Sequence, residues 1–158
     1  MTRVATSPSP APLEWGLNFI RWAQDHLRVL FRALNRAEEQ SFIVACSDET
    51  TALTAGTAKV TFRMPWALAL YDLKASLTTA QTSGSTFIVD INVSGSTIIS
   101  TKLTIDNTEE TSKTAATAFV FSSTDTTIDA DEEVSIEIDQ IGDGTAKGLK
   151  ITFYGVRV

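Results

Sequence analysis

The segment from residue 13 to residue 40 limits most strongly what this chain can form. It follows Pro12 and is rich in Leu, Ala, Arg, Glu and Gln, which favours one long helix. On a helical wheel one narrow polar arc carries Glu14, Asn18, Arg21, Asp25, Arg28, Arg32, Arg36 and Glu39. The rest of the circumference carries Leu13, Trp15, Leu17, Phe19, Ile20, Trp22, Leu27, Val29, Leu30, Phe31 and Leu34. This apolar arc covers about two thirds of the helix.

An arc this wide exceeds what one packing surface can cover, because a helix on a single surface needs a stripe about 100° wide. Trp15, Phe19 and Trp22 could dock the helix against the chain's own β domain, but the opposite flank would then stay in water. A membrane-surface helix is a rival interpretation, and acidic Glu14 and Asp25 on the arginine-lined polar arc weaken it. The residues expected to oligomerise or dock are Leu13, Trp15, Leu17, Phe19, Ile20, Trp22, Leu27, Leu30, Phe31 and Leu34.

Residues 41–158 differ in character, with 21 threonines, frequent Val and Ile, and recurrent turn signals. Val134, Ile136 and Ile138 alternate with polar residues, and Ser94-Gly95-Ser96 and Gly142-Asp143-Gly144 predict tight turns. Strands are expected near residues 41–46, 58–64, 66–78, 86–93, 97–105, 116–122, 133–139 and 148–157.

This strand pattern predicts a mainly β chain: a long N-terminal α-helix followed by an antiparallel two-sheet β-sandwich. A jelly-roll-like topology is favoured, with an immunoglobulin-like sandwich as the alternative. The expected organisation is an extended, proline-rich arm at 1–12, an amphipathic oligomerisation or docking helix at 13–40, and the sandwich at 41–158.

Charge and composition narrow the function classes. Residues 1–40 have five basic and four acidic side chains, whereas residues 41–158 have eight basic and fifteen acidic ones. An acidic β domain repels phosphate backbones, so nucleic acid is not an expected partner. No segment resembles a signal peptide or a membrane-spanning helix, so we expect a soluble chain made inside a cell, without a membrane partner.

Candidate chemical sites are few. Cys46 is expected to be a buried thiol, and the single histidine, His26, a packing or hydrogen-bonded interface residue. Asp72 and Asp90 sit among ordinary alternating strand residues, and Asp139–Gly144 is expected to form a turn. An acidic group is expected to be a solvated loop rather than a calcium site: Asp125, Asp129, Asp131, Glu132 and Glu133. We therefore expect no catalytic residues, no metal and no cofactor; the chain is not expected to be an enzyme.

Six stretches of the β domain carry a resemblance to a known kind of module. They are 45–53 (ACSDETTAL), 56–65 (GTAKVTFRMP), 75–80 (ASLTTA), 87–92 (FIVDIN), 100–106 (STKLTID) and 136–142 (IEIDQIG). This region, roughly residues 41–158, resembles a β-sandwich module of bacteriophage virion proteins, among them tail-fibre-like and uncharacterised structural proteins. The arm and the helix lie outside the resemblance, and no catalytic residues come with it.

The resemblance implies a virion location after synthesis in the host cytoplasm. It also implies a homo-oligomer, expected to be a trimer, bound to other virion proteins through residues 1–40. The expected protein is a non-enzymatic homotrimeric short fibre or spike-like appendage. The first alternative is a head decoration protein that stabilises the capsid. The second is a module that binds host surface glycans, although Trp66, Tyr71, Tyr154 and several phenylalanines are its only aromatic candidates, and most are expected to face inward.

Overall fold

The computed structural model describes residues 12–158 and, within them, the side chains of residues 16–31 and 39–158. The chain divides between Ala37 and Glu38 into a helical unit and a β unit. Apart from Pro12, the arm expected at residues 1–12 lies outside the described residues. Within the described part of the chain, no helix combines the length and the apolar character needed to cross a bilayer.

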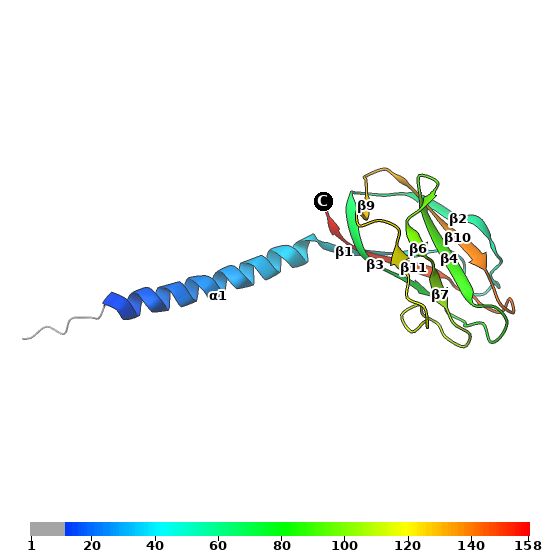
Figure 1. Cartoon of the computed structure of the whole chain (residues 1–158), viewed down its shortest axis with the longest axis horizontal. Helices are drawn as coiled ribbons and strands as arrows, with labels where there is room; N and C mark the ends of the chain where they lie inside the picture. Colours follow the sequence, from blue (N-terminus) through cyan, green and yellow to red (C-terminus); the bar gives the residue numbers. More distant parts are fainter. Residues whose placement is uncertain (1–11) are drawn as a thin grey trace, which may run out of the picture. The chain divides into compact units, whose positions relative to one another are not determined.

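The helical unit is one α-helix, α1 (Pro12–Glu38), drawn in blue and cyan in Figure 1. Proline suits the first turn of a helix, where the missing N–H would have had no partner. At 1.5 Å per residue, 27 residues give a length of about 40 Å. The helix ends at Glu38, two residues before the expected Gln40, because Glu39 and Gln40 already pair with the last strand. No residue separates the helix from the first strand.

The β unit contains eleven short to medium strands in the described residues. They are β1 (Glu39–Ala45), β2 (Gly56–Arg63), β3 (Leu68–Ser76), β4 (Phe87–Val93), β5 (Ser96–Thr97), β6 (Ile99–Thr101), β7 (Leu103–Ile105), β8 (Val120–Phe121), β9 (Thr127–Ile128), β10 (Glu133–Gln140) and β11 (Lys150–Arg157).

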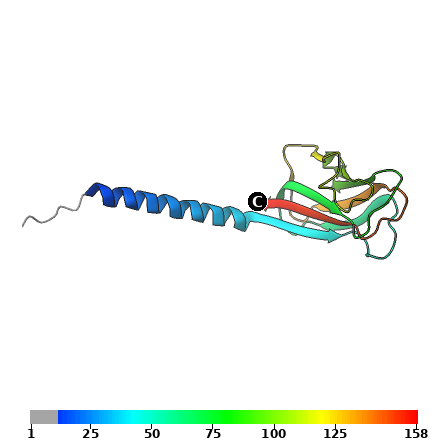
Figure 2. The same cartoon turned by 90° about the horizontal axis from the view of Figure 1, so that it is seen from below.

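Nine of these strands form a two-sheet antiparallel sandwich with jelly-roll topology, and β6 and β8 form a separate two-stranded sheet. One sheet has the order β1-β11-β3-β9, and the other has the order β2-β10-β4, with β5 and β7 both pairing with β4 (Figures 1 and 2). The pairings are nested: β1 with β11, β2 with β10, β3 with β9, and β4 with β7. This nesting is the pattern of a long folded hairpin wrapped into two sheets. It confirms the expected sandwich and favours the jelly roll over the immunoglobulin-like alternative, in which the first and last strands do not pair.

The observed strands differ from the expected ones between residues 96 and 128. The expected strand at 97–105 is divided into β5, β6 and β7, because its successive parts pair with different strands: β5 and β7 with β4, and β6 with β8. The expected strand at 116–122 is reduced to the two residues of β8. Strand β9 was not expected at all, since two residues are too few to show an alternation.

The core lies between the two sheets and is built from the alternation seen in the sequence. Val134, Ile136 and Ile138 of β10 are buried, while Glu137 between them is not. The facing sheet contributes Phe153 of β11 and buried residues of β3. Successive side chains of a strand point to opposite faces, so the apolar residues at every second position all face the core. The expected alternation in 133–139 is therefore confirmed.

The expected hairpin at Ser94-Gly95-Ser96 is also confirmed. Ser94 and Gly95 join β4 to β5, and their φ angles are +49° and +81°. Two central residues with positive φ characterise the hairpin turn whose twist matches that of the flanking strands. Glycine removes the steric cost at the second position, where a Cβ would otherwise crowd the backbone.

Two isoleucines on strands provide a matched test of this core. Ile136 is fully buried, whereas Ile43 of β1 is 65% exposed. Ile136→Ala should lower the free energy of unfolding by about 2–5 kcal/mol, because it removes buried methylenes and leaves a cavity. Ile43→Ala should change it by less than about 0.5 kcal/mol. Urea denaturation at one fixed protein concentration measures both, and equal losses would contradict this core.

Candidate assembly surface

The described part of α1 carries a large exposed apolar surface. Its large apolar side chains are between 51% and 66% exposed: Leu17, Phe19, Ile20, Trp22, Leu27, Val29, Leu30 and Phe31. Isolated exposed apolar residues are normal on soluble proteins, but a contiguous apolar surface marks a site of interaction.

Seven of the ten residues predicted to oligomerise or dock are among these exposed side chains. The side chains of the other three, Leu13, Trp15 and Leu34, lie outside the described residues. The role of all ten in assembly stays a prediction at this point. The helix provides their common geometry, since residues three or four positions apart lie on one face.

Three aromatic rings form a ladder along one side of α1. The ring centroids of Phe19 and Trp22 are 5.9 Å apart and stacked, and those of Trp22 and His26 are 4.1 Å apart. His26 Nδ1 lies 2.8 Å from the carbonyl oxygen of Trp22. Because a carbonyl only accepts, Nδ1 is the donor in this contact. The ladder therefore fixes the His26 ring beside Trp22, one helical turn away.

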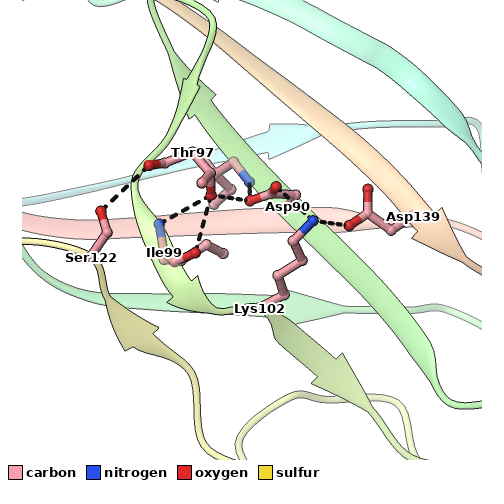
Figure 3. A network of polar contacts seen from close by, with 7 residues as sticks. Asp90, Thr97, Ile99, Lys102, Ser122 and Asp139 are labelled. Carbon is pink, nitrogen blue, oxygen red and sulfur yellow. Dashed lines mark hydrogen bonds and ion pairs between the residues drawn. The ribbon is translucent and has the colours of Figure 1, made fainter.

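The most strongly buried acidic side chain of the sandwich is Asp90, in β4 (Figure 3). Its carboxylate accepts hydrogen bonds from the Ile91 amide at 2.8 Å and the Thr97 hydroxyl at 2.6 Å, and forms an ion pair with Lys102 at 2.9 Å. Lys102 also contacts Asp139 of β10. The carboxylates of Asp139 and Asp90 raise the pKa of Lys102 above its ordinary value. These contacts link neighbouring strands and neutralise a buried charge.

Sequence reasoning treated Asp90 as an ordinary strand residue and did not identify Lys102. A carboxylate inside the mostly apolar run of β4 could have indicated a buried, partnered acid. The partner itself depends on the strand order, which the local sequence does not encode.

The acidic residues considered as a calcium site do not converge. Asp125 accepts from the Thr127 amide at 3.0 Å, and Glu132 accepts from Ser94 at 2.9 Å and from the Asp129 amide at 3.1 Å. The carboxylates of Asp125 and Glu132 are thus occupied by local hydrogen bonds. Across residues covered by the structure, no cluster of three or more His, Cys, Asp or Glu side chains could hold a metal ion.

Asp143 lies in the turn between β10 and β11, where its carboxylate accepts hydrogen bonds from two loops. One carboxylate oxygen accepts from Thr82 and Ser83, and the other accepts from the amide and hydroxyl of Thr145. The hydrogen bonds from Thr145 and Thr82 hold the pKa of Asp143 well below its usual range. Asp143 therefore connects two loops, as the expected turn at residues 142–144 requires.

Cys46 is buried, as the sequence analysis expected, and desolvation raises the pKa of its thiol to about 12. A thiol held in the protonated form is a poor nucleophile. It borders a hollow of about 210 Å³, together with Asp48, Leu53 and Lys59. This is smaller than the roughly 300–1,000 Å³ of ordinary small-molecule sites.

Two tyrosines lie on the outer face of the sheet β1-β11-β3-β9. Tyr71 of β3 is exposed and Tyr154 of β11 is half-buried, with ring centroids 6.4 Å apart. Most aromatic side chains were expected to face inward, and Tyr71 and Tyr154 are exceptions on the outer face. The pairing of β3 with β11 shifts at this point, since Tyr154 pairs with Asp72 and Gly155 pairs with Leu70. Tyr71 is the extra residue of this bulge, which resets the alternation of the strand.

Comparison with known proteins adds no relative to these observations. No family model matches the chain, and neither a curated protein nor a solved structure matches it significantly.

Proposed function

We propose that this protein is a non-enzymatic structural component of a bacteriophage virion, a homotrimeric short fibre or spike-like appendage. The observation that carries the proposal is the exposed apolar surface of α1. In the proposed particle, residues 1–40 bind other virion proteins and join three copies, and the sandwich projects into the surroundings. The protein acts by binding free energy alone, with no cofactor, metal or catalytic residue.

Magnitudes support assembly through α1. Burying 600 Å² of apolar surface would contribute roughly 15 kcal/mol before the entropy costs of association, at about 25 cal/mol per Å². Eight large side chains, each more than half exposed, can supply an area of this order. If these side chains stay in water, the free energy of burial is not obtained and the protein is prone to nonspecific aggregation.

The sandwich supports a structural role of the same kind. Two-sheet jelly rolls recur in viral capsid proteins and in lectins. Fold alone does not establish function, so this likeness is an analogy. It agrees with the resemblance of residues 41–158 to phage virion modules, and the polar clusters at Asp90 and Asp143 have a sufficient structural explanation.

A pair of substitutions on the helix tests the assembly. Ile20→Glu together with Leu27→Glu should convert the full-length protein from trimer to monomer, because each change places an unpaired charge in a desolvated contact. Asn18→Glu together with Arg28→Glu places two glutamates on the polar arc instead and should leave the trimer intact. Multi-angle light scattering gives the mass of each. A monomeric, well-behaved unmodified protein would refute the proposed trimer.

A head decoration protein is the nearest alternative, because the same parts could clamp adjacent capsid subunits. Removing the protein from the phage separates the two. Loss of an appendage should leave the heat resistance of the heads unchanged and reduce adsorption to host cells. Loss of a decoration protein should lower the temperature at which heads release DNA, with adsorption preserved. Plaque assays after graded heating, together with adsorption assays, measure both effects.

A glycan-binding role for the sandwich is a second candidate, favoured by the neighbouring tyrosines Tyr71 and Tyr154. Aromatic rings with one exposed face can stack on sugar rings while the hydroxyl remains in water. Tyr71→Ala with Tyr154→Ala should then weaken binding to host surface polysaccharide by at least about tenfold. Ile43→Ala, also on the outer face of this sheet, is the matched control. Undiminished binding, measured by biolayer interferometry, would dismiss the tyrosines as a glycan site.

A further inference from the structure

Most apolar residues of α1 follow two heptad seams along the two sides of the broad apolar surface, and Leu30 lies between them. In the first seam, the four d positions are Leu13, Ile20, Leu27 and Leu34. Its a positions are Leu17, Gln24, Phe31 and Glu38. Six of these eight positions are apolar, with Gln24 and Glu38 as the exceptions, and an apolar residue at most a and d positions is the repeat of a left-handed coiled coil. We call this set the heptad seam.

The second seam runs along the opposite side and is aromatic at its N-terminal half. It contains Trp15, Phe19, Trp22, His26 and Val29, again at alternating spacings of four and three. We call it the aromatic seam. It includes the stacked ladder of Phe19, Trp22 and His26.

One layer of the heptad seam favours more than two strands, as the proposed trimer requires. A two-stranded coil prefers β-branched residues at a with leucine at d, whereas leucine at a with isoleucine at d shifts the preference to higher order. Leu17 at a and Ile20 at d follow the second rule. The g positions on the flank of this seam are small or apolar, namely Gly16, Ala23, Leu30 and Ala37. These small or apolar g residues extend the apolar surface beyond the a and d positions, which gives more contact area than a two-stranded coil buries.

Gln24 favours a parallel arrangement in register. In a parallel bundle the three Gln24 amides meet in one layer, where each can donate to the next and accept from the previous one. In an antiparallel arrangement centred on the helix, Gln24 would face Leu27, and its amide would be buried without a partner. Closed threefold symmetry likewise makes all three helices parallel.

The aromatic seam is a poor inner surface for identical copies. Helices in such bundles lie about 8–10 Å apart. Three Trp22 rings in one layer would overpack that space, which forces strained rotamers or displaced helices. The Trp22 ring instead lies between Phe19 and His26 of its own helix, stacked on the first and tilted against the second.

We infer that the heptad seam is covered by two further copies of this chain in a parallel, in-register coiled coil, which leaves the aromatic seam facing outward. This inference rests on the proposed homotrimer and assigns its inner face. It also gives the two seams different roles. The heptad seam joins the three copies, and the aromatic seam remains accessible to another virion protein.

Site-specific disulfide formation tests the assignment in the full-length protein. Single cysteines are introduced as Leu17→Cys and Phe31→Cys on the heptad seam, and as Phe19→Cys and Asp25→Cys away from it. The native Cys46 is buried with a raised pKa, so the unmodified protein gives a low background. After mild oxidation, linked pairs are quantified on a non-reducing gel. Leu17→Cys and Phe31→Cys should give at least fivefold more linked pairs than the other two variants.

The outcomes separate this inference from the proposed function. A trimer by light scattering that links through Phe19→Cys more than through Phe31→Cys overturns the assignment of the inner face and leaves the trimer standing. In the antiparallel register, where Gln24 faces Leu27, Ile20 faces Phe31. Efficient linkage only in a mixture of the Ile20→Cys and Phe31→Cys proteins therefore indicates antiparallel helices and overturns the parallel arrangement. An unmodified protein that is monomeric overturns both proposals.

A second comparison guards against cysteine variants that disturb the assembly. Ile20→Ala should raise the concentration at which the trimer half-dissociates by at least tenfold, because it empties part of a central layer. Trp22→Ala should change it by less than threefold. Sedimentation equilibrium measures both. A larger effect of Trp22→Ala than of Ile20→Ala overturns the inference.

Discussion

The pairing of the first strand with the last is the interaction on which the rest of the molecule depends. All seven residues of β1 pair with β11, and the stacked rings of Phe42 and Phe153, 4.9 Å between centroids, join the two strands on the inner side. This pairing closes the outermost pair of the nested jelly roll. It also holds the strand that continues directly from α1. Any load on α1 is therefore transmitted to the sandwich through β1, which is held by both backbone and aromatic contacts.

Two polar clusters, at Asp143 and at Asp90, hold loops and strands of this sandwich together. Successive strands of a jelly roll cross between sheets, so its loops must be held where they meet at the ends. Asp143 holds two such loops, and Asp90 with Lys102 joins segments that are adjacent only in the folded state. Nearly every buried polar group of a stable fold requires a partner. The carboxylates of Asp90 and Asp143 are thus accounted for by satisfied hydrogen bonds and, at Asp90, an ion pair.

Much of the sandwich could be predicted because its long strands alternate regularly, as β10 does. Prediction was wrong where alternation is interrupted or absent. The bulge at Tyr71 resets the inward and outward faces of β3, and β9 is too short to show a pattern. The pairing of Asp90 with Lys102 arises from strand order and could not be read locally. The helix presents a different difficulty. A wheel drawn at the repeat of a straight helix drifts by about 20° per heptad, so two narrow seams blur into one broad apolar arc.

The charge distribution suggests why the helix, rather than the sandwich, should hold copies together. Residues 41–158 have seven more acidic than basic side chains, so identical sandwiches repel one another at close range. Residues 1–40 are nearly neutral, with one excess positive charge, and carry the exposed apolar surface. Attraction is therefore concentrated in a segment of about 40 Å, while the sandwiches gain nothing from mutual contact. Such a division keeps the sandwiches free to present their outer faces, and it confines the specificity of assembly to the spacing of side chains along α1.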